Sequence, residues 1–154
     1  MAYILDHPQA ETCVLCAKLA ADQDAQNYVL WRGEHCAILL NLYPYNNGHL
    51  MVIPYAHQPS LELLPTQVQT EMMLAVSRSL SLLRRAMQPH GFNVGLNIGR
   101  AAGAGIDTHV HIHVVPRWEG DTNFMPLLAE TRIIPEWLDD TYARLKGVLE
   151  SESD

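Results

Sequence analysis

The sequence is short of basic residues and contains no long apolar run. Only 10 Lys and Arg stand against 17 Asp and Glu, for a formal net charge of -7, so the chain lacks the basic surface that binding to duplex nucleic acid requires. Nowhere do 18 apolar residues follow one another, which argues against a transmembrane helix. The first residues also lack a basic flank followed by an apolar stretch, so we expect neither secretion nor insertion into a membrane.

Cysteine is scarce as well. Cys13, Cys16 and Cys36 are a small and odd-numbered set, which argues against a disulfide framework and for a reducing, cytoplasmic location. The 154 residues, of which 48% are hydrophobic and 18% charged, are enough for one sizeable core and too few for two. We therefore expect a single domain over residues 1–150, followed by an acidic tail at residues 151–154.

Apolar periodicity and turn residues predict an α+β fold. The apolar spacing over residues 61–87 is typical of a long amphipathic helix, whereas runs of β-branched and aromatic residues bounded by Gly, Pro and Asn are typical of strands. The expected architecture is an antiparallel sheet of about five strands, with one long packed helix and a C-terminal helix. Strands are expected at residues 27–32, 35–41, 48–54, 92–98 and 109–118, and helices at residues 11–21, 61–87 and 135–149.

Three histidines at every second position mark the last expected strand. Alternate side chains of a β-strand point to the same face of the sheet. We therefore expect His109, His111 and His113 to lie on one face. A solvated polar face would more commonly carry Thr, Lys or Glu. A neutral imidazole can attack phosphorus through one ring nitrogen while an acceptor holds the other. Alternating histidines could equally ligate a metal ion, and the pattern alone leaves both readings open.

A loop of small residues precedes the histidines. Residues 99–108 are mostly Gly and Ala, and such a loop allows backbone N–H groups to approach a ligand closely and to form an anion-binding nest. Because this loop adjoins the histidine strand, we expect the amides of Gly103 and Gly105 to contact a phosphate.

These motifs resemble the histidine triad (HIT) superfamily of nucleotide hydrolases and transferases. The resemblance rests on the His-x-His-x-His motif with Val114 and Val115 after it. It also rests on an upstream block, residues 41–57, with a Gly-His-Leu-Met-Val-Ile-Pro core at residues 48–54. The residues after the triad, 114–118 and 120–124, are similar to a bacterial branch that includes diadenosine tetraphosphate phosphorylases. The resemblance implies a HIT-like fold and a homodimer.

The resemblance also implies roles for three histidines. His111 would attack the α-phosphorus of a nucleotide and form a nucleotidyl-imidazole, which water or inorganic phosphate then resolves. His113 would contact the phosphate and the oxygen of the leaving group, and His49 would lie close behind it.

The same resemblance suggests how the nucleotide is held. Asn41 would contact the ribose hydroxyls, and Asn97 would contact a phosphate. The sequence departs from many relatives just before the triad, where they carry Ser, Thr or Gln and this chain has Ala104, Gly105 and Ile106. The Gly103 and Gly105 amides are the expected replacement for that side-chain donor.

The Cys13-x-x-Cys16 pair suggests half of a zinc site. Two free thiols in a helix are the alternative. Branches of the superfamily that bind structural zinc use such a pair together with two histidines, which match His57 and His109 in this sequence. The resemblance therefore implies a Cys₂His₂ site formed by Cys13, Cys16, His57 and His109. Cys36, among apolar neighbours, is expected in the core.

We therefore expect an enzyme that transfers or hydrolyses nucleotides through a covalent nucleotidyl-histidine intermediate. The expected substrate is a nucleoside polyphosphate such as diadenosine tetraphosphate, with an adenine nucleotide and inorganic phosphate as the binding partners. A nucleoside phosphoramidate hydrolase is an alternative within the enzyme class. A nucleotide-binding or metal-binding module without turnover is the alternative outside it.

Overall fold

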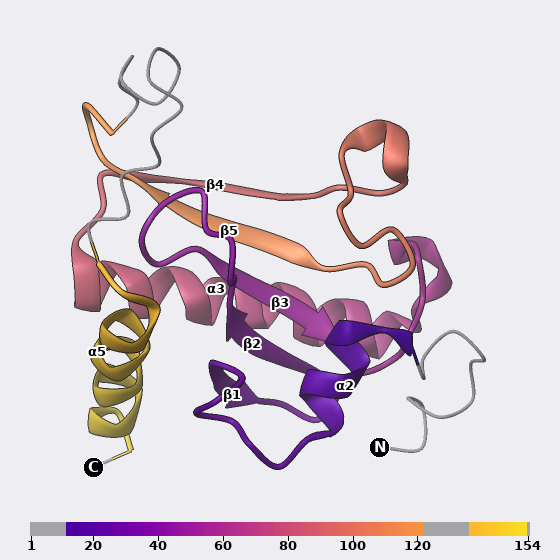
Figure 1. Cartoon of the computed structure of the whole chain (residues 1–154), viewed down its shortest axis with the longest axis horizontal. Helices are drawn as coiled ribbons and strands as arrows, with labels where there is room; N and C mark the ends of the chain where they lie inside the picture. Colours follow the sequence, from indigo (N-terminus) through magenta and orange to yellow (C-terminus); the bar gives the residue numbers. More distant parts are fainter. Residues whose placement is uncertain (1–11, 122–135, 154) are drawn as a thin grey trace.

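The computed structural model describes residues 12–121 and 136–153 (Figure 1). Its five strands form one antiparallel sheet in the order β1-β2-β3-β5-β4, so the expected α+β fold with a five-stranded antiparallel sheet is confirmed. The strands are β1 Val29–Arg32, β2 Cys36–Leu40, β3 Leu50–Pro54, β4 Gly91–Leu96 and β5 Ile112–Arg117. The helices are α2 Val14–Ala20, α3 Thr66–Met87 and α5 Leu138–Ser151, with 3-10 turns η2 Leu61–Leu63 and η3 Arg100–Ala102.

Strand β5, which carries His113, is bordered by strands on both sides. In the two ladders His113 lies opposite Met51 of β3 and opposite Gly95 of β4. Because β3 follows directly after His49, the pairing of β3 with β5 brings two histidines 64 positions apart in sequence into contact.

Alternation along β3 and β5 divides the core between the two faces of the sheet. One face carries Val52, Ile112 and Val114, which pack with the buried side of α3. The other face carries Met51 and Ile53, which pack with α2. Figure 1 shows the long helix α3 running along the sheet, with the short α2 on the strands and α5 at one end. The odd-numbered side chains of β5 thus lie on the face that the long helix does not cover.

The long helix begins later than the sequence suggested. Residues 61–63 form the separate turn η2, and α3 begins at Thr66 after Pro65. A proline disfavours helical backbone in the residue before it, and Leu64 is extended, with φ -89° and ψ 143°. The expectation of one continuous helix over residues 61–87 was therefore wrong at its first turn.

The histidine strand also begins later than expected. β5 starts at Ile112, so His109 and His111 precede it. The cause is a competing hydrogen bond, because the N–H of Val110 donates to the carbonyl of Gln58 at 2.7 Å, in the loop after β3. Only His113 of the three histidines is part of the regular strand.

The ends of the other elements shift by a few residues. Helix α2 begins after Cys13, and β4 ends at Leu96, which leaves Asn97 just beyond it. Helix α5 ends at Ser151, two residues past the expected end, and Glu152 pairs with Arg78 and Arg85 of α3. The division into residues 1–150 and an acidic tail stays a prediction, and the expected helix start at residue 135 and the motif end at residue 124 lie outside the described residues.

In the described part of the chain, no helix combines the length and the apolar character needed to cross a membrane.

Candidate functional site

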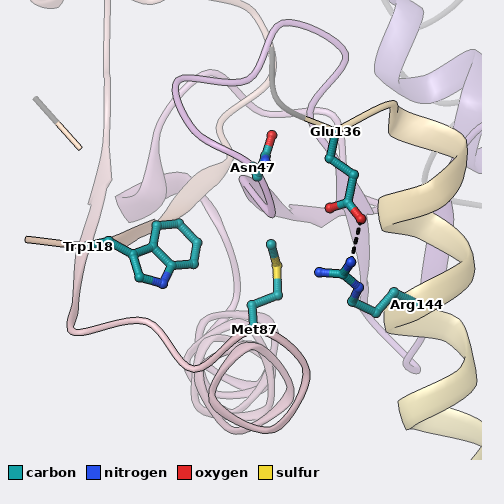
Figure 2. A pocket seen from close by; sticks show the side chains of 5 residues that line it. All are labelled: Asn47, Met87, Trp118, Glu136 and Arg144. Atoms are coloured by element: carbon teal, nitrogen blue, oxygen red, sulfur yellow. Dashed lines mark ion pairs between the residues drawn. The ribbon is translucent and has the colours of Figure 1, made fainter. Parts of the chain in front are cut away.

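One cavity bordered by described residues has no histidine in its lining. Its volume is about 480 Å³. Figure 2 shows its side chains, with an ion pair of 2.7 Å between Arg144 and Glu136 on one wall. The lining residues are Asn47, Met87, Trp118, Glu136 and Arg144. None of the site residues expected from the sequence is among them, so the candidate site is built from the imidazole contacts that follow.

Three imidazoles lie in a row where β3 and β5 meet. The ring centroids of His111 and His113 are 4.8 Å apart, and those of His113 and His49 are 5.0 Å apart. His49 is fully buried, and His111 is 8% exposed. The structure thus brings together the three residues that the sequence named as catalytic.

Hydrogen bonds assign the proton positions of His49 and His113. The backbone N–H of Tyr45 donates to Nδ1 of His49 at 3.2 Å, so the proton of this ring is on Nε2. Nε2 of His49 then donates to Nδ1 of His113 at 2.9 Å. His113 consequently carries its own proton on Nε2, where it is a donor for a ligand.

The ring of His111 is held in the opposite tautomer. Its Nδ1 lies 2.8 Å from the backbone carbonyl of His109, and because a carbonyl can only accept, Nδ1 carries the proton. Nε2 of His111 is therefore left with its lone pair, beside a donor on His113. An unprotonated nitrogen next to a proton donor is the arrangement that nucleophilic attack on a phosphate ester requires.

Burial keeps these rings neutral near pH 7. It lowers the pKa of His49 to about 3, with further contributions from His113 and His111, and it lowers the pKa of His113 to about 4, with a contribution from His111. The pKa of His111 is also lowered by burial, and the hydrogen bond to the His109 carbonyl opposes that shift. A neutral imidazole retains the lone pair that attack requires.

Asn41 lies beside the imidazole row. Its Oδ1 accepts from the N–H of Tyr43 at 2.9 Å, and its Nδ2 lies 3.4 Å from Nε2 of His49. Nδ2 of Asn41 carries protons, and Nε2 of His49 also carries one in the tautomer assigned above. The Asn41 amide is therefore available as a donor to a ligand at this site. Asn97 lies one residue beyond Leu96, the last residue of β4, which pairs with Ile112, the residue after His111.

The glycine loop is ordered by its own hydrogen bonds. Gly99 and Gly103 have φ values of 84° and 89°, which favour glycine. The N–H of Gly103 donates to the carbonyl of Arg100 at 2.9 Å, so its contact with a phosphate would require that bond to open. The anion nest with the Gly103 and Gly105 amides stays a prediction. The Arg100 side chain pairs with Asp107 at 2.7 Å.

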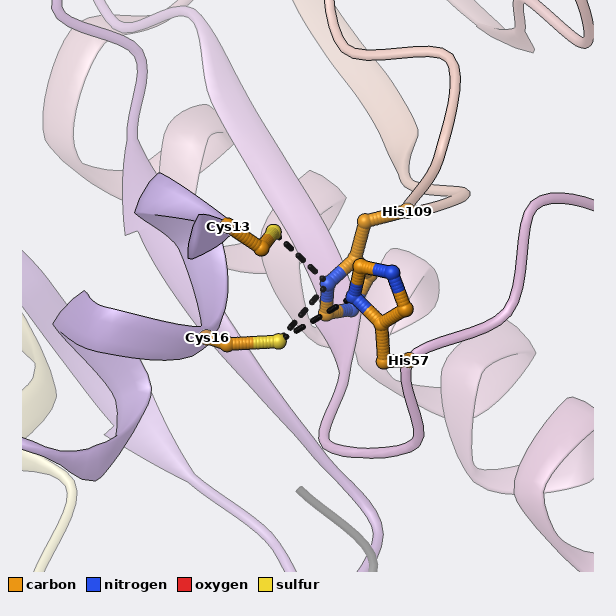
Figure 3. A group of neighbouring side chains, drawn as sticks. All are labelled: Cys13, Cys16, His57 and His109. Carbon is orange, nitrogen blue, oxygen red and sulfur yellow. Dashed lines mark hydrogen bonds between the residues drawn. The ribbon is translucent and has the colours of Figure 1, made fainter. Parts of the chain in front are cut away.

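The four expected zinc ligands form a second cluster (Figure 3). Nδ1 of His109 lies 3.5 Å from Sγ of Cys13 and 3.4 Å from Sγ of Cys16, and Nδ1 of His57 lies 3.2 Å from Sγ of Cys16. A tetrahedral zinc ion with bonds of about 2.3 Å to sulfur and about 2.0 Å to nitrogen holds these ligands about 3.5 Å apart. These three separations fit a shared zinc ion, and all four ligand atoms lie within 4.8 Å of one another.

A backbone carbonyl orients His109 toward the thiols. Nε2 of His109 donates to the carbonyl of Pro54 at 2.8 Å, which leaves the lone pair on Nδ1. Burial, together with Cys13, raises the pKa of Cys16 to about 12, and burial lowers the pKa of His109 to about 4. Cys36 lies in the core on β2 and takes no part in the cluster.

The segment that carries His49 is supported by the side chain of Asn46, to which the sequence assigned no role. The side chain of Asn46 donates to Asp121 at 2.8 Å and to the carbonyl of Pro116 at 3.1 Å. Asp121 also accepts from Arg117 at 2.8 Å. No role was expected for Asn46 or Tyr45 from the sequence, although the aromatic residues flanking Pro44 offered a signal.

Comparisons with known proteins identify the family to which this chain is similar. The HIT domain family model matches residues 22–120. An AP-4-A phosphorylase of Mycobacterium tuberculosis is 44% identical over 118 residues, which are 77% of this chain and 60% of that protein. An asymmetrical bis(5'-nucleosyl)-tetraphosphatase of Schizosaccharomyces pombe is 30% identical over 60% of this chain and 50% of that protein. The chain thus spans no more than about 60% of either relative.

A solved structure has the same fold over nearly the whole chain. It is a Zn-bound histidine triad family protein from Mycobacterium smegmatis, 28% identical, with a TM-score of 0.75. The match covers 93% of this chain and 96% of that one.

Proposed function

Because the chain belongs to the HIT family, we propose that it is a nucleotidyl transferase or hydrolase that acts on nucleoside polyphosphates resembling diadenosine tetraphosphate. The observation that carries this proposal is the His111 tautomer, in which the carbonyl of His109 holds Nδ1 and leaves Nε2 with its lone pair. The names of the two relatives, a phosphorylase and a tetraphosphatase, support the choice of substrate.

The first step forms a covalent intermediate on His111. Nε2 attacks the α-phosphorus, a nitrogen–phosphorus bond forms, and the bond between that phosphorus and the bridging oxygen breaks. The electron pair leaves with the oxygen of the departing nucleotide, toward which Nε2–H of His113 donates. The imidazole of His111 becomes positively charged, and the carbonyl of His109 on Nδ1–H stabilises that charge.

The second step releases the nucleotide. An oxygen of water or inorganic phosphate attacks the same phosphorus, the nitrogen–phosphorus bond breaks, and the electron pair returns to Nε2 of His111. Asn41 and Asn97, with the amides of Gly103 and Gly105, would hold the ribose and phosphates of the adenine nucleotide. The donor on Asn41 next to His49 supports its place in this set.

We propose that Cys13, Cys16, His57 and His109 hold one structural zinc ion. The donor set and its separations support this assignment, as does the Zn-bound relative. When bound, the zinc would join α2, the loop after β3 and the segment before β5, and so keep His111 in place from outside the reaction.

We also propose a homodimer in the cytoplasm. Strand β4 is at the edge of the sheet, and Val94 on β4 and Ile98 beyond it are 46% and 43% exposed, which suits pairing with a second copy. The three described cysteines are free, in keeping with a reducing compartment. Size-exclusion chromatography with light scattering would test the dimer, and a monomer at micromolar concentration would contradict it.

Product analysis tests the proposed reaction. Diadenosine tetraphosphate is incubated with the protein, with and without inorganic phosphate, and the nucleotides are separated. ADP plus ATP indicates phosphorolysis, and AMP plus ATP indicates hydrolysis. Protein quenched in alkali should carry adenylate on histidine, and acid should then release it. Binding without any product would favour the module without turnover.

A further inference from the structure

One exposed aromatic side chain lies directly against the buried imidazole row. The ring of Tyr45 stacks on His49, with centroids 5.2 Å apart and planes inclined by 16°. It also lies 6.4 Å from the ring of His113. Tyr45 is 74% exposed, whereas His49 is fully buried. One face of the phenol ring therefore covers the imidazole, and most of the side chain is open to solvent.

Hydrogen bonds on both sides of Tyr45 hold it in this position. Its own N–H donates to Nδ1 of His49, and the side chain of Asn46 is tied to Asp121 and to the carbonyl of Pro116. A ring that stacks on His49 with one face and is 74% exposed leaves its other face open to a ligand. Every nucleobase has a π face that can stack on such a ring.

The order of the rings indicates which base would stack there. The row runs from His111 to His113, then to His49 and Tyr45, and each neighbouring pair of centroids is 4.8 to 5.2 Å apart. In the proposed function His111 takes the transferred phosphorus and His113 serves the departing oxygen. Tyr45 therefore lies beyond His113, on the side toward which the leaving group departs.

We propose that the exposed face of Tyr45 stacks on the nucleobase of the leaving nucleotide and so determines a preference for substrates with two nucleosides. This inference rests on the proposed function and deepens it. A dinucleotide polyphosphate carries a second base on its leaving group, and a phosphoramidate does not. The interaction with Tyr45 is therefore available only to the first kind of substrate.

The experiment compares Tyr45→Ala and Tyr45→Phe with wild-type protein on diadenosine tetraphosphate and on adenosine 5'-phosphoramidate. The dissociation constant of AMP supplies a second measurement on a single nucleoside. Tyr43→Ala is the matched control, because Tyr43 is 75% exposed in the same segment and, among the described residues, its ring does not contact His49 or His113.

Tyr45→Ala should lower kcat/KM for diadenosine tetraphosphate by about 10-fold to 100-fold, mainly through KM, which is the size of effect expected when a base loses an aromatic partner. Turnover of the phosphoramidate and affinity for AMP should change by less than about 2-fold, because neither compound carries a second base. That ratio corresponds to about 0.4 kcal/mol. Tyr45→Phe and Tyr43→Ala should resemble wild type on both substrates.

Other outcomes would overturn the inference. An equal loss of kcat/KM on both substrates would mean that Tyr45 supports the imidazoles of His49 and His113. Weaker AMP binding would mean that Tyr45 contacts the transferred nucleoside. An unchanged kcat/KM for diadenosine tetraphosphate would remove any role for the ring. A wild-type protein that turns over neither substrate would instead contradict the proposed function, and this inference with it.

Discussion

The Cys₂His₂ cluster and the imidazole row use their histidines differently, although His109 and His111 are two residues apart. In each ring a backbone carbonyl accepts from one nitrogen and leaves the other with its lone pair. Pro54 holds Nε2 of His109, so Nδ1 faces the thiols. The carbonyl of His109 holds Nδ1 of His111, so Nε2 is left for the substrate. The choice of nitrogen thus separates the proposed metal ligand, His109, from the proposed nucleophile, His111.

The surroundings of the two clusters differ as well. His109 and His57 are 0% and 2% exposed and adjoin two buried thiols, which suits a closed four-coordinate site. His111 is 8% exposed and His113 is partly buried, next to the segment that carries Tyr45. A ligand can reach the second cluster, so we expect changes there to alter turnover and changes in the first to alter stability.

The largest expected effect is that of His111→Asn on turnover. Removal of the nucleophile should lower kcat by at least about 1000-fold, with zinc content and thermal midpoint close to those of wild type. Steady-state kinetics with metal analysis of the same preparation measures both. Retention of turnover within 10-fold would exclude the covalent route.

Cys16→Ser should have the complementary effect. It removes one of four ligands, so zinc content should fall from about one equivalent to less than half, and the midpoint of thermal unfolding should fall on the order of 10 °C. Cys36→Ala is the matched control, because Cys36 is equally buried but lies outside the cluster. Full zinc content in Cys16→Ser would count against the assigned site.

Acid should destabilise the protein through the imidazole row. His49 and His113 have folded pKa values of about 3 and about 4, below the 6.5 of an exposed histidine. Above pH 6.5 neither the folded nor the unfolded state binds a proton at these rings. Below pH 6.5 only the unfolded state does, so the free energy of unfolding falls as the pH decreases toward 4, by up to about 1.4 kcal/mol per pH unit for each ring.

Urea unfolding at pH 7 and pH 5 measures this dependence. The double variant His49→Asn, His113→Asn serves as the control, because acid release of zinc is common to both proteins. The control should lose less stability between the two pH values than wild type. Equal losses would assign the acid sensitivity to the zinc cluster.

The smallest expected effect is on the segment that supports His49. Asn46→Ala removes the hydrogen bonds to Asp121 and to the Pro116 carbonyl, which should lower the free energy of unfolding by about 1 kcal/mol and kcat/KM by a few-fold. Asn47→Ala is the neighbouring control, since Asn47 lines the cavity of Figure 2 instead. Chemical denaturation and initial rates would compare them, and identical behaviour would remove the role given to Asn46.

Much of this protein could be read from local patterns. The triad, the Cys-x-x-Cys pair and the positions of the strands along the chain follow from spacing and turn residues. Alternation and helical periodicity are properties of short segments. The same short-range rules missed where α3 and β5 begin, since Pro65 and the bond from Val110 to Gln58 act against the apolar pattern. The same rules assigned no role to Asn46 or Tyr45.

The division of labour within the triad needed the folded chain. The spacing of His109, His111 and His113 treats the three rings alike. His111 finds its acceptor locally, on the carbonyl of His109. The partners of His109 and His113, which are Pro54 and His49, lie near them only because β3 pairs with β5. Ring tautomers depend on which acceptor lies within hydrogen-bond distance, and no sequence interval specifies that. The fold therefore decides which histidine nitrogen faces the thiols and which keeps its lone pair for the proposed attack on a nucleotide.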